Sequence, residues 1–263
     1  MQKVKNLSIQ KADAAKDIEL INAYSVKELR PEEVFCFDLI LCDNDADRDN
    51  ERFTDATLDQ LAGLFVGKTG ISDHVWSAGN QVARLYRAEV QTTEEKNRLG
   101  EPLKRLVGSA YMLRSEHTQP MIDAIEGGIV KEVSVGCAIR KMECSICETP
   151  FSMNWDTWEY ECQNHHVKGR EFDGELCVGE LKDAEDAYEF SFVAVPAQRG
   201  AGVTKSVSDP ESAFAVLMTA DLSKYGDQLR AMLPRIQSAL EDAAEREARA
   251  KILAENERFL KKG

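Results

Sequence analysis

Long apolar runs and an excess of basic residues are both missing from this chain of 263 residues. No stretch approaches the ~18 consecutive apolar residues that cross a bilayer. The opening residues, MQKVKNLSIQ, lack the apolar core of a secretory signal. A net charge of −13 leaves no basic excess with which to neutralise the phosphates of nucleic acid. These absences predict a cytosolic protein that binds neither membrane nor nucleic acid, and the acidity favours solubility or a basic partner.

Histidine is also scarce, with four in the chain, whereas cysteine occurs seven times. An odd number of cysteines without a secretion signal argues against a disulfide framework. Metal binding or plain burial is the better interpretation of these thiols.

The order of apolar and polar segments predicts an α+β protein with appendages. We expect a polar N-terminal segment over residues 1–33, a main domain over 34–207, and a helical C-terminal tail over 208–263. Within the main domain, period-2 and apolar patterns predict strands, and capped apolar stripes predict helices. The expected strands are 34–42, 81–90, 104–113, 129–140 and 187–197, and the expected helices are 54–67 and 118–128.

The strand expected over 129–140 has two unlike faces. Val133, Val135, Cys137 and Ile139 alternate on one face, and Ser134, Gly136 and Ala138 on the other. A face made only of small residues leaves room for another group to approach the backbone.

Residues 141–177 form an insert rich in cysteine and histidine. Cys144 and Cys147 make a C-x2-C knuckle, and Cys162 follows after 14 residues. Such spacing is typical of a tetrahedral zinc site, and a site with all four positions filled by protein is structural. His165, His166 and Cys177 are the candidates for the fourth ligand.

His74 and Ser134 are the most informative pair for catalysis. A serine hydroxyl is a weak nucleophile until a base removes its proton, and histidine titrates in the range suited to that task. The sequence EVSVG around Ser134 is not the G-x-S-x-G elbow of the α/β-hydrolases, because Glu132 replaces the first glycine.

Three motifs in order resemble those of the tailed-phage prohead maturation proteases. They are a histidine in ISDH that precedes the NQVARL strand, the segment GGIVKEVSVGC, and the late segment EFSFVAVPAQRGAGV. Together they span roughly residues 34 to 203. Some members of the family also carry an insert with CSIC and H-x-x-G, and CSIC with HVKG matches it here, which favours His166 over His165 as the fourth metal ligand.

The resemblance implies a serine endopeptidase with a fold similar to herpesvirus assemblin, a mostly antiparallel β-barrel flanked by helices. It implies His74 as the base, Ser134 as the nucleophile and Glu189 as the third member, since a carboxylate can orient an imidazole. Arg199 is a candidate for a role at the oxyanion. The implied substrates are the major capsid protein and scaffold, cleaved in the host cytoplasm inside the assembling prohead, where the protease self-associates. The tail would be a scaffold-like segment or a propeptide.

Two other functions fit the same sequence. One is a non-catalytic capsid assembly protein of the same fold, with the structural zinc site and the tail as docking surfaces. The other is a cysteine peptidase that uses Cys137, which is disfavoured because this side chain would point to the opposite face of the strand from Ser134.

Overall fold

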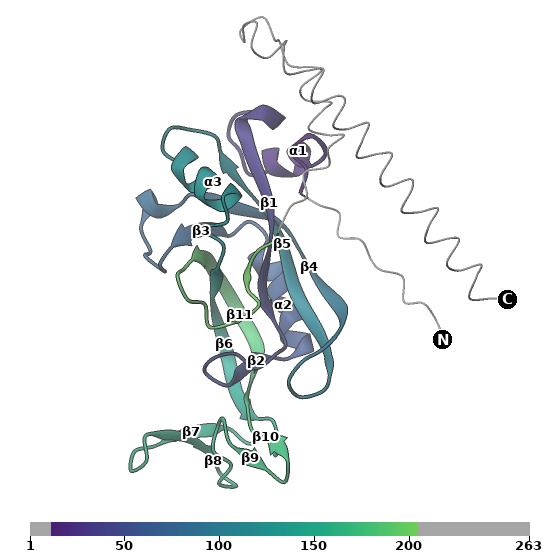
Figure 1. Ribbon diagram of the computed structural model, residues 1–263, viewed down its shortest axis with the longest axis vertical. Helices are drawn as coiled ribbons and strands as arrows, with labels where there is room; N and C mark the ends of the chain where they lie inside the picture. Colours follow the sequence, from purple (N-terminus) through teal and green to yellow (C-terminus); the bar gives the residue numbers. More distant parts are fainter. Residues whose placement is uncertain (1–11, 205–263) are drawn as a thin grey trace, which may run out of the picture. The chain divides into compact units, whose positions relative to one another are not determined.

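The computed structural model describes residues 12–204, which form an α+β fold (Figure 1). The α+β class expected from the sequence is therefore confirmed, and the tail expected over 208–263 lies outside the described residues. The helices are α1 (Ala14–Asn22), α2 (Asp55–Phe65) and α3 (Gln119–Glu126), with two short 3₁₀ turns, η1 (Pro31–Glu33) and η2 (Ala78–Asn80). Among the described residues, none of these helices has the length and apolar character that would let it span a bilayer.

The main sheet is mixed but mostly antiparallel. Its strands are β1 (Val34–Asp43), β2 (Glu51–Phe53), β3 (Thr69–Ser72), β4 (Ala83–Lys96), β5 (Pro102–Leu113), β6 (Val133–Cys144), β11 (Gly179–Phe192) and β12 (Gly202–Val203). They are ordered β12-β1-β5-β4-β3-β11-β2, with β6 paired to β11, and only the pairs of β11 with β2 and β3 are parallel.

The strand pairings within residues 12–204 do not by themselves close this sheet into a barrel. One isolated antiparallel bridge, between Glu132 and Gly202, places the start of β6 beside β12. The closed barrel expected from the sequence is therefore not found, because only this single bridge, and no full strand pairing, joins the two ends of the sheet in the part of the chain that the structure describes.

The core lies between the sheet and α2. Thr54 caps the helix by accepting a hydrogen bond from the N–H of Thr57 at 3.3 Å, and Leu58, Leu61 and Phe65 are fully buried at helical spacing. Burial of one such leucine stabilises the fold by about 2 kcal/mol. The apolar face expected for β6 is confirmed, because Val133, Val135, Cys137 and Ile139 all pack against this core.

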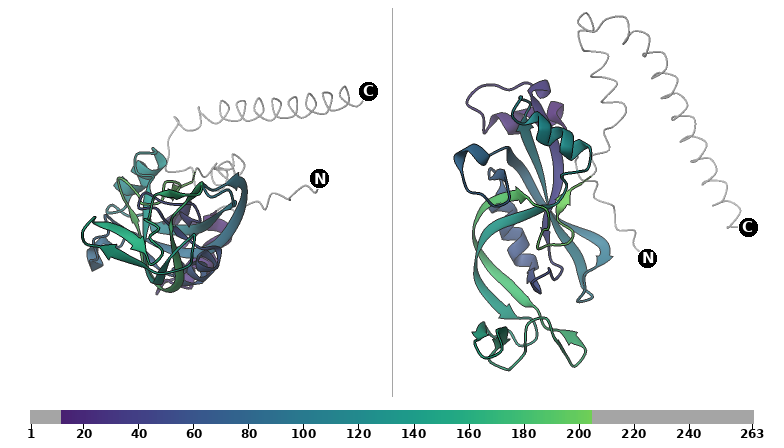
Figure 2. Two further views of the ribbon diagram at one scale, coloured as in Figure 1. Left: turned by 90° about the horizontal axis from the view of Figure 1, so that it is seen from below. Right: turned by 60° about the vertical axis from the view of Figure 1, so that its left-hand side comes forward.

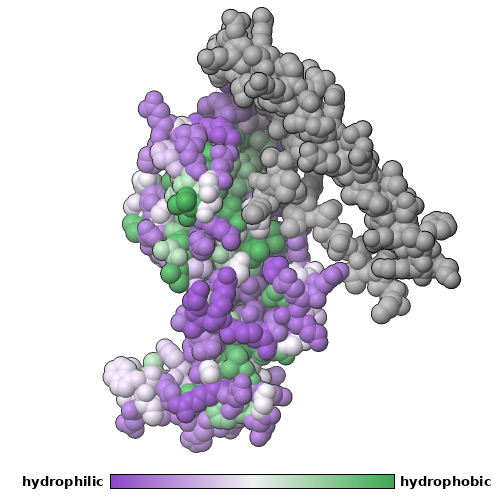
Figure 3. Space-filling view, in the orientation of Figure 1, coloured by the Kyte–Doolittle hydropathy of each residue, from purple (hydrophilic) through white to green (hydrophobic). Residues whose placement is uncertain are grey.

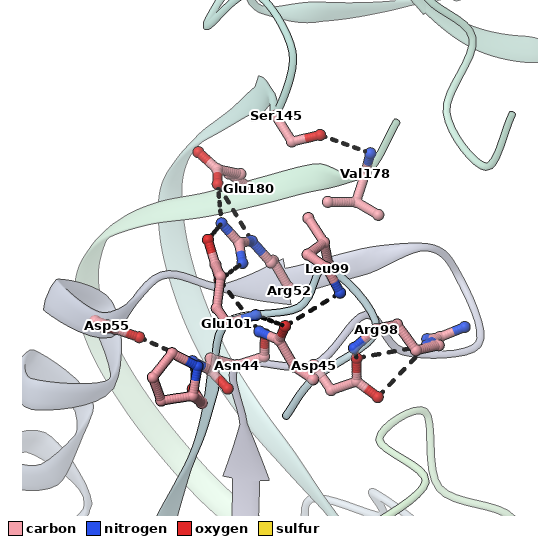
Figure 4. Close-up of polar contacts among 12 residues, drawn as sticks. Asn44, Asp45, Arg52, Asp55, Arg98, Leu99, Glu101, Ser145, Val178 and Glu180 are labelled. Atoms are coloured by element: carbon pink, nitrogen blue, oxygen red, sulfur yellow. Dashed lines mark hydrogen bonds and ion pairs between the residues drawn. The ribbon is translucent and has the colours of Figure 1, made fainter. Parts of the chain in front are cut away.

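A polar network joins the β4–β5 turn to the start of β11 (Figure 4). The side chain of Arg52 is only 10% exposed. Its guanidinium group lies between Glu101 of the turn and Glu180 of β11. Its Nε donates to Glu180 at 3.2 Å. A buried guanidinium group needs carboxylate partners for its charge and its N–H groups. The network therefore holds the β4–β5 hairpin against the first residues of β11.

The strands β6 and β11 run side by side and lead into the insert (Figure 2). β11 differs from the strand expected over 187–197: it begins at Gly179 and ends at Phe192. Its early part is charged and lacks an apolar signal, and it is a strand because it pairs with β6 over its whole length. Beyond Phe192, the N–H of Val193 bonds to the carbonyl of Glu132, and the chain leaves the sheet.

The insert consists of two small hairpins. They are formed by β7 (Phe151–Asn154) with β8 (Glu159–Cys162), and by β9 (Glu171–Phe172) with β10 (Glu175–Leu176). Both hairpins are too short to bury much apolar surface, and their shared core contains Cys144, Cys162 and Cys177. A fold of this kind needs a further source of stability, such as a metal.

Candidate active site and metal centre

The loop after β3 carries His74 over one face of the sheet. The N–H of Asp73 bonds to the carbonyl of Phe192 at 3.0 Å, and the N–H of His74 bonds to the Ser191 hydroxyl at 3.1 Å. Asp73 and His74 both have φ = 54°, in the left-handed region, which costs about 1–2 kcal/mol for a residue with a Cβ. Aspartate and histidine tolerate this conformation better than most residues, and two such residues in a row also occur at functional sites.

His74 is paired with a buried carboxylate. Its Nδ1 lies 2.8 Å from Oε1 of Glu189, and the Glu189 side chain is 3% exposed while that of His74 is 43% exposed. Toward an ionised carboxylate, which can only accept hydrogen bonds, Nδ1 is the donor, and in that neutral tautomer the lone pair is on Nε2. The contact therefore favours the tautomer in which Nε2 is the ring nitrogen that could accept a proton.

Ser191 fixes the same carboxylate from the other side. Its hydroxyl is fully buried and donates to Oε2 of Glu189 at 2.6 Å, while its oxygen accepts the N–H of His74. Both roles of this hydroxyl are used, so Ser191 positions Glu189 and is not free to react. The sequence did not lead us to expect a role for Ser191. The signal for it was the E-x-S spacing of Glu189 and Ser191, which places both side chains on one face of the strand.

Ser134 lies on the same face of the sheet as this pair. In the β6–β11 register Ser134 is opposite Ser191, and Gly136 is opposite Glu189. Residues opposite each other in antiparallel strands have Cβ atoms about 4.5–5.5 Å apart. Ser134 is half-buried, and its hydroxyl makes no hydrogen bond within residues 12–204. The structure thus brings Ser134 to the face that His74 covers, without a direct bond between the two.

The small-residue face of β6 makes room for Glu189. A Cβ built on Gly136 would collide with Oε1 of Glu189 and would lie 3.2 Å from its Cδ. The absence of a side chain at this position is what lets the carboxylate reach His74.

The remaining sequence candidates, Cys137 and Arg199, make no hydrogen bond to this pair within the described residues. Burial, and next the charge of Glu189, raise the pKa of Cys137 to about 11, so this thiol is protonated at neutral pH. The guanidinium of Arg199 donates to the carbonyl of Ala46 at 3.4 Å, and among the described contacts it has none with His74, Glu189 or Ser134.

Four side chains of the insert meet in a metal-binding arrangement. The ligand atoms of Cys144, Cys147, Cys162 and His166 all lie within 4.8 Å of one another. Cys147 Sγ is 3.5 Å from Cys162 Sγ, and Cys144 Sγ is 3.6 Å from Nδ1 of His166. Tetrahedral zinc with the usual bond lengths separates two sulfurs by about 3.8 Å and a sulfur from a nitrogen by about 3.6 Å. The donors and their spacing therefore fit a zinc ion.

The two other candidates for the fourth ligand have different surroundings. Nδ1 of His165 pairs with Glu161 at 2.5 Å, and its side chain is 87% exposed. Cys177 is buried with its Sγ 3.6 Å from that of Cys144, but it is outside the group of four. The expectation that His166 joins the three cysteines agrees with this arrangement.

The polar surroundings favour a thiolate at Cys147. Burial opposes its ionisation, but hydrogen bonds from Thr149, Asn164 and His166 lower the pKa of the thiol to about 5. Thiolate is the form that binds zinc. Burial is the largest cause that raises the pKa of both Cys144 and Cys177, so a bound metal would be needed to favour the thiolate form of either residue.

Comparison of the chain with protein-family models, curated proteins and solved structures finds no match.

Proposed function

We propose that the chain is a serine endopeptidase in which Ser134 is the nucleophile, His74 the general base and Glu189 the residue that orients the imidazole. The 2.8 Å contact between His74 and the buried Glu189 is the observation that carries the proposal. It fixes the tautomer in which Nε2 is basic, as in other acid–histidine–serine arrangements. Ser134, on the same face and with a free hydroxyl, is the nucleophile that this base can serve.

The reaction follows from these positions. The Ser134 oxygen forms a bond to the carbonyl carbon of the peptide, and its proton passes to Nε2 of His74. The carbon–nitrogen bond then breaks as Nε2 gives that proton to the leaving amine. The oxygen of a water molecule then forms a bond to the carbonyl carbon of the resulting ester and its proton passes to Nε2. The bond between that carbon and the Ser134 oxygen breaks, the carboxylic acid leaves, and Nε2 returns the proton to the Ser134 oxygen. The missing bond between Ser134 and His74 is compatible with this scheme, because such bonds often tighten only when substrate binds.

The motifs around these residues lead us to propose the prohead maturation proteases as the family. The late strand with Glu189 and the histidine loop, which lie far apart in the sequence, meet at one site. The Glu132–Gly202 bridge supports the barrel of that family, because it joins β6 to β12, the other end of the strand order. The proposed substrates are then capsid and scaffold proteins, cleaved inside the prohead in the host cytoplasm.

We assign zinc to the insert as a structural ion. Cys144, Cys147, Cys162 and His166 supply four protein ligands, which leaves no position for a catalytic water. The ion would hold together two hairpins that have little core of their own, and it takes no part in the peptidase reaction.

Co-expression of the chain with the capsid protein of its own virus tests the peptidase, with shortened capsid protein as the readout. We expect Ser134→Ala to abolish cleavage. Because His74 has φ = 54°, His74→Asn is a better partner variant than His74→Ala, since asparagine tolerates this conformation. His74→Asn should also abolish cleavage, and the double variant should be no worse than either, because the two residues act as a unit.

A serine-reactive fluorophosphonate provides a test that needs no substrate. It should label Ser134 in the wild type, and labelling should fall sharply in His74→Asn. Undiminished processing by Ser134→Ala would refute the peptidase at this site and leave the capsid assembly protein as the function.

A further inference from the structure

A cavity of about 470 Å³ opens beside Glu189. It is bounded by β3, by the loop after His74 and by the end of β11, with Ile71, Trp76, Ala78 and Tyr188 among its lining residues. Its volume falls in the range of about 300–1,000 Å³ that is typical of ligand pockets. Apolar side chains also reach the surface of the described chain at the level of β3 (Figure 3).

The cavity lies on the same face of the sheet as Ser134. β3 and β11 pair in parallel with Thr69 opposite Glu189 and Ile71 opposite Ser191, so these side chains share one face. The β6 register adds Ser134 to this face, opposite Ser191. A peptide that places a carbonyl group at Ser134 therefore lies beside the cavity.

A β-bulge adds an aromatic wall. The register of β11 shifts between Ala187 and Glu189, so Tyr188 is the extra residue of the bulge. Bulges redirect side chains next to active sites. The ring of Tyr188 lies 5.3 Å from that of Trp76, and both are well exposed, at 41% and 69%. Two exposed aromatic rings in contact form an apolar surface that a partner group can cover.

The cavity presents no free charge. Its two charged lining residues are Lys68 and Glu189. Lys68 pairs with Asp186 at 3.0 Å, and Glu189 is held by His74 and Ser191. The exposed Ser77 and Gln81 of the lining can hydrogen-bond a neutral polar group, but a charged group would lose water without meeting an unpaired opposite charge among the lining residues, whereas an apolar group would not.

We propose that this cavity is the specificity pocket of the peptidase and takes a large apolar side chain, such as that of Leu, Met or Phe, within two residues of the cleaved bond. The inference rests on the proposed peptidase function. The occupant is a substrate side chain because the cavity shares its wall, Glu189, with the catalytic pair.

Digestion of a library of peptides from a bacterial proteome tests the pocket, with residue preferences read at each position around the cleaved bonds. For the wild type we expect one position to favour Leu, Met and Phe and to exclude Asp and Glu. Ala78→Trp fills the cavity and should shift that position to Gly, Ala and Ser. Trp76→Ala removes a wall and should lower kcat/KM for the apolar peptides by about tenfold or more.

Trp158→Ala is the matched control, because Trp158 is an exposed tryptophan of the insert at 74% exposure, outside the cavity lining. It should leave every preference unchanged. Both cavity variants change exposed side chains, and a melting curve like that of the wild type checks that they fold.

The outcomes separate the two proposals. Cleavage by the wild type with preferences that neither Ala78→Trp nor Trp76→Ala alters would overturn the pocket and leave the peptidase intact. A self-associated form that Trp76→Ala abolishes, with cleavage preferences unchanged, would assign the cavity to a second copy of the chain and overturn the pocket equally. Absence of any cleavage or fluorophosphonate labelling by the wild type would refute the peptidase and the pocket with it.

Discussion

Gly136→Ala should disable the candidate site without touching any of its reacting groups. A Cβ at position 136 would occupy the place of Oε1 of Glu189. The carboxylate cannot turn aside cheaply, because it is buried and bonded to both His74 and Ser191. The added methyl group must therefore break the contact with His74 or push the two strands apart.

The size of the effect follows from the bonds at stake. A hydrogen bond to a charged group contributes about 1.5–3 kcal/mol. Loss of one such bond lowers the free energy of unfolding by that amount, which corresponds to a fall in Tm of roughly 3–12 °C for a domain of this size. If the lost contact orients the base, the same free energy lowers kcat by about 10- to 150-fold.

Three measurements apply to the purified protein: the melting temperature, the rate of fluorophosphonate labelling at Ser134, and the ¹⁵N spectrum of the histidine rings. In the wild type the spectrum should show His74 with its proton on Nδ1, and in Gly136→Ala this tautomer should lose its dominance. Gly79→Ala is the control, because a Cβ on Gly79 meets no atom within 4 Å. A Gly136→Ala protein with wild-type melting, labelling and tautomer would refute the role assigned to the Glu189–His74 contact.

Three further results are expected. Mass spectrometry of the purified protein should find about one zinc ion per chain, and the Cys147→Ser variant should lose most of this zinc. A zinc content near zero in the wild type would contradict the proposed metal site. Cys177→Ser should keep the zinc, because Cys177 is outside the group of four, whereas loss of zinc from this variant would make Cys177 a ligand. Burial raises the pKa of Asp43 to about 6, so the folded state binds this proton more tightly than the unfolded state. The contribution of Asp43 to the free energy of unfolding should therefore fall by about 2 kcal/mol as the pH rises from 4 to 6. Asp43→Asn should remove this fall in denaturant titrations at the two pH values, and an unchanged profile would show that the carboxyl group is not the cause.

Patterns of neighbouring residues correctly predicted several helices and strands of the fold. The run 34–42 is β1, Thr54 caps α2, and the alternation from Val133 to Ile139 points to the core. The C-x2-C knuckle likewise predicted two of the clustered ligands, because a tight turn alone brings them together.

Strands and contacts that depend on residues far away in the sequence were harder to predict. The first half of β11 is charged and becomes a strand only through pairing with β6, and the strand ends at Phe192 although the apolar pattern continues to Val195. The choice of His166 over His165 depended on a resemblance, since the spacing alone allows both. Contacts across more than 100 residues, such as that between His74 and Glu189, leave no local trace in one sequence.

The register of β11 shows why the candidate site could not be derived from alternation alone. Alternation correctly separates Glu189 and Ser191 from Phe190 and Phe192, but it does not say which set shares a face with Ser134. The bulge at Tyr188 decides this: if Tyr188 were paired in regular register after Ala187, it would lie opposite Gly136, and Glu189 would lie opposite Val135 and face the core. The same extra residue supplies the aromatic wall of the cavity beside Glu189. One bulge in one strand thus places Glu189 beside His74 and also places Tyr188 in the lining of the neighbouring cavity.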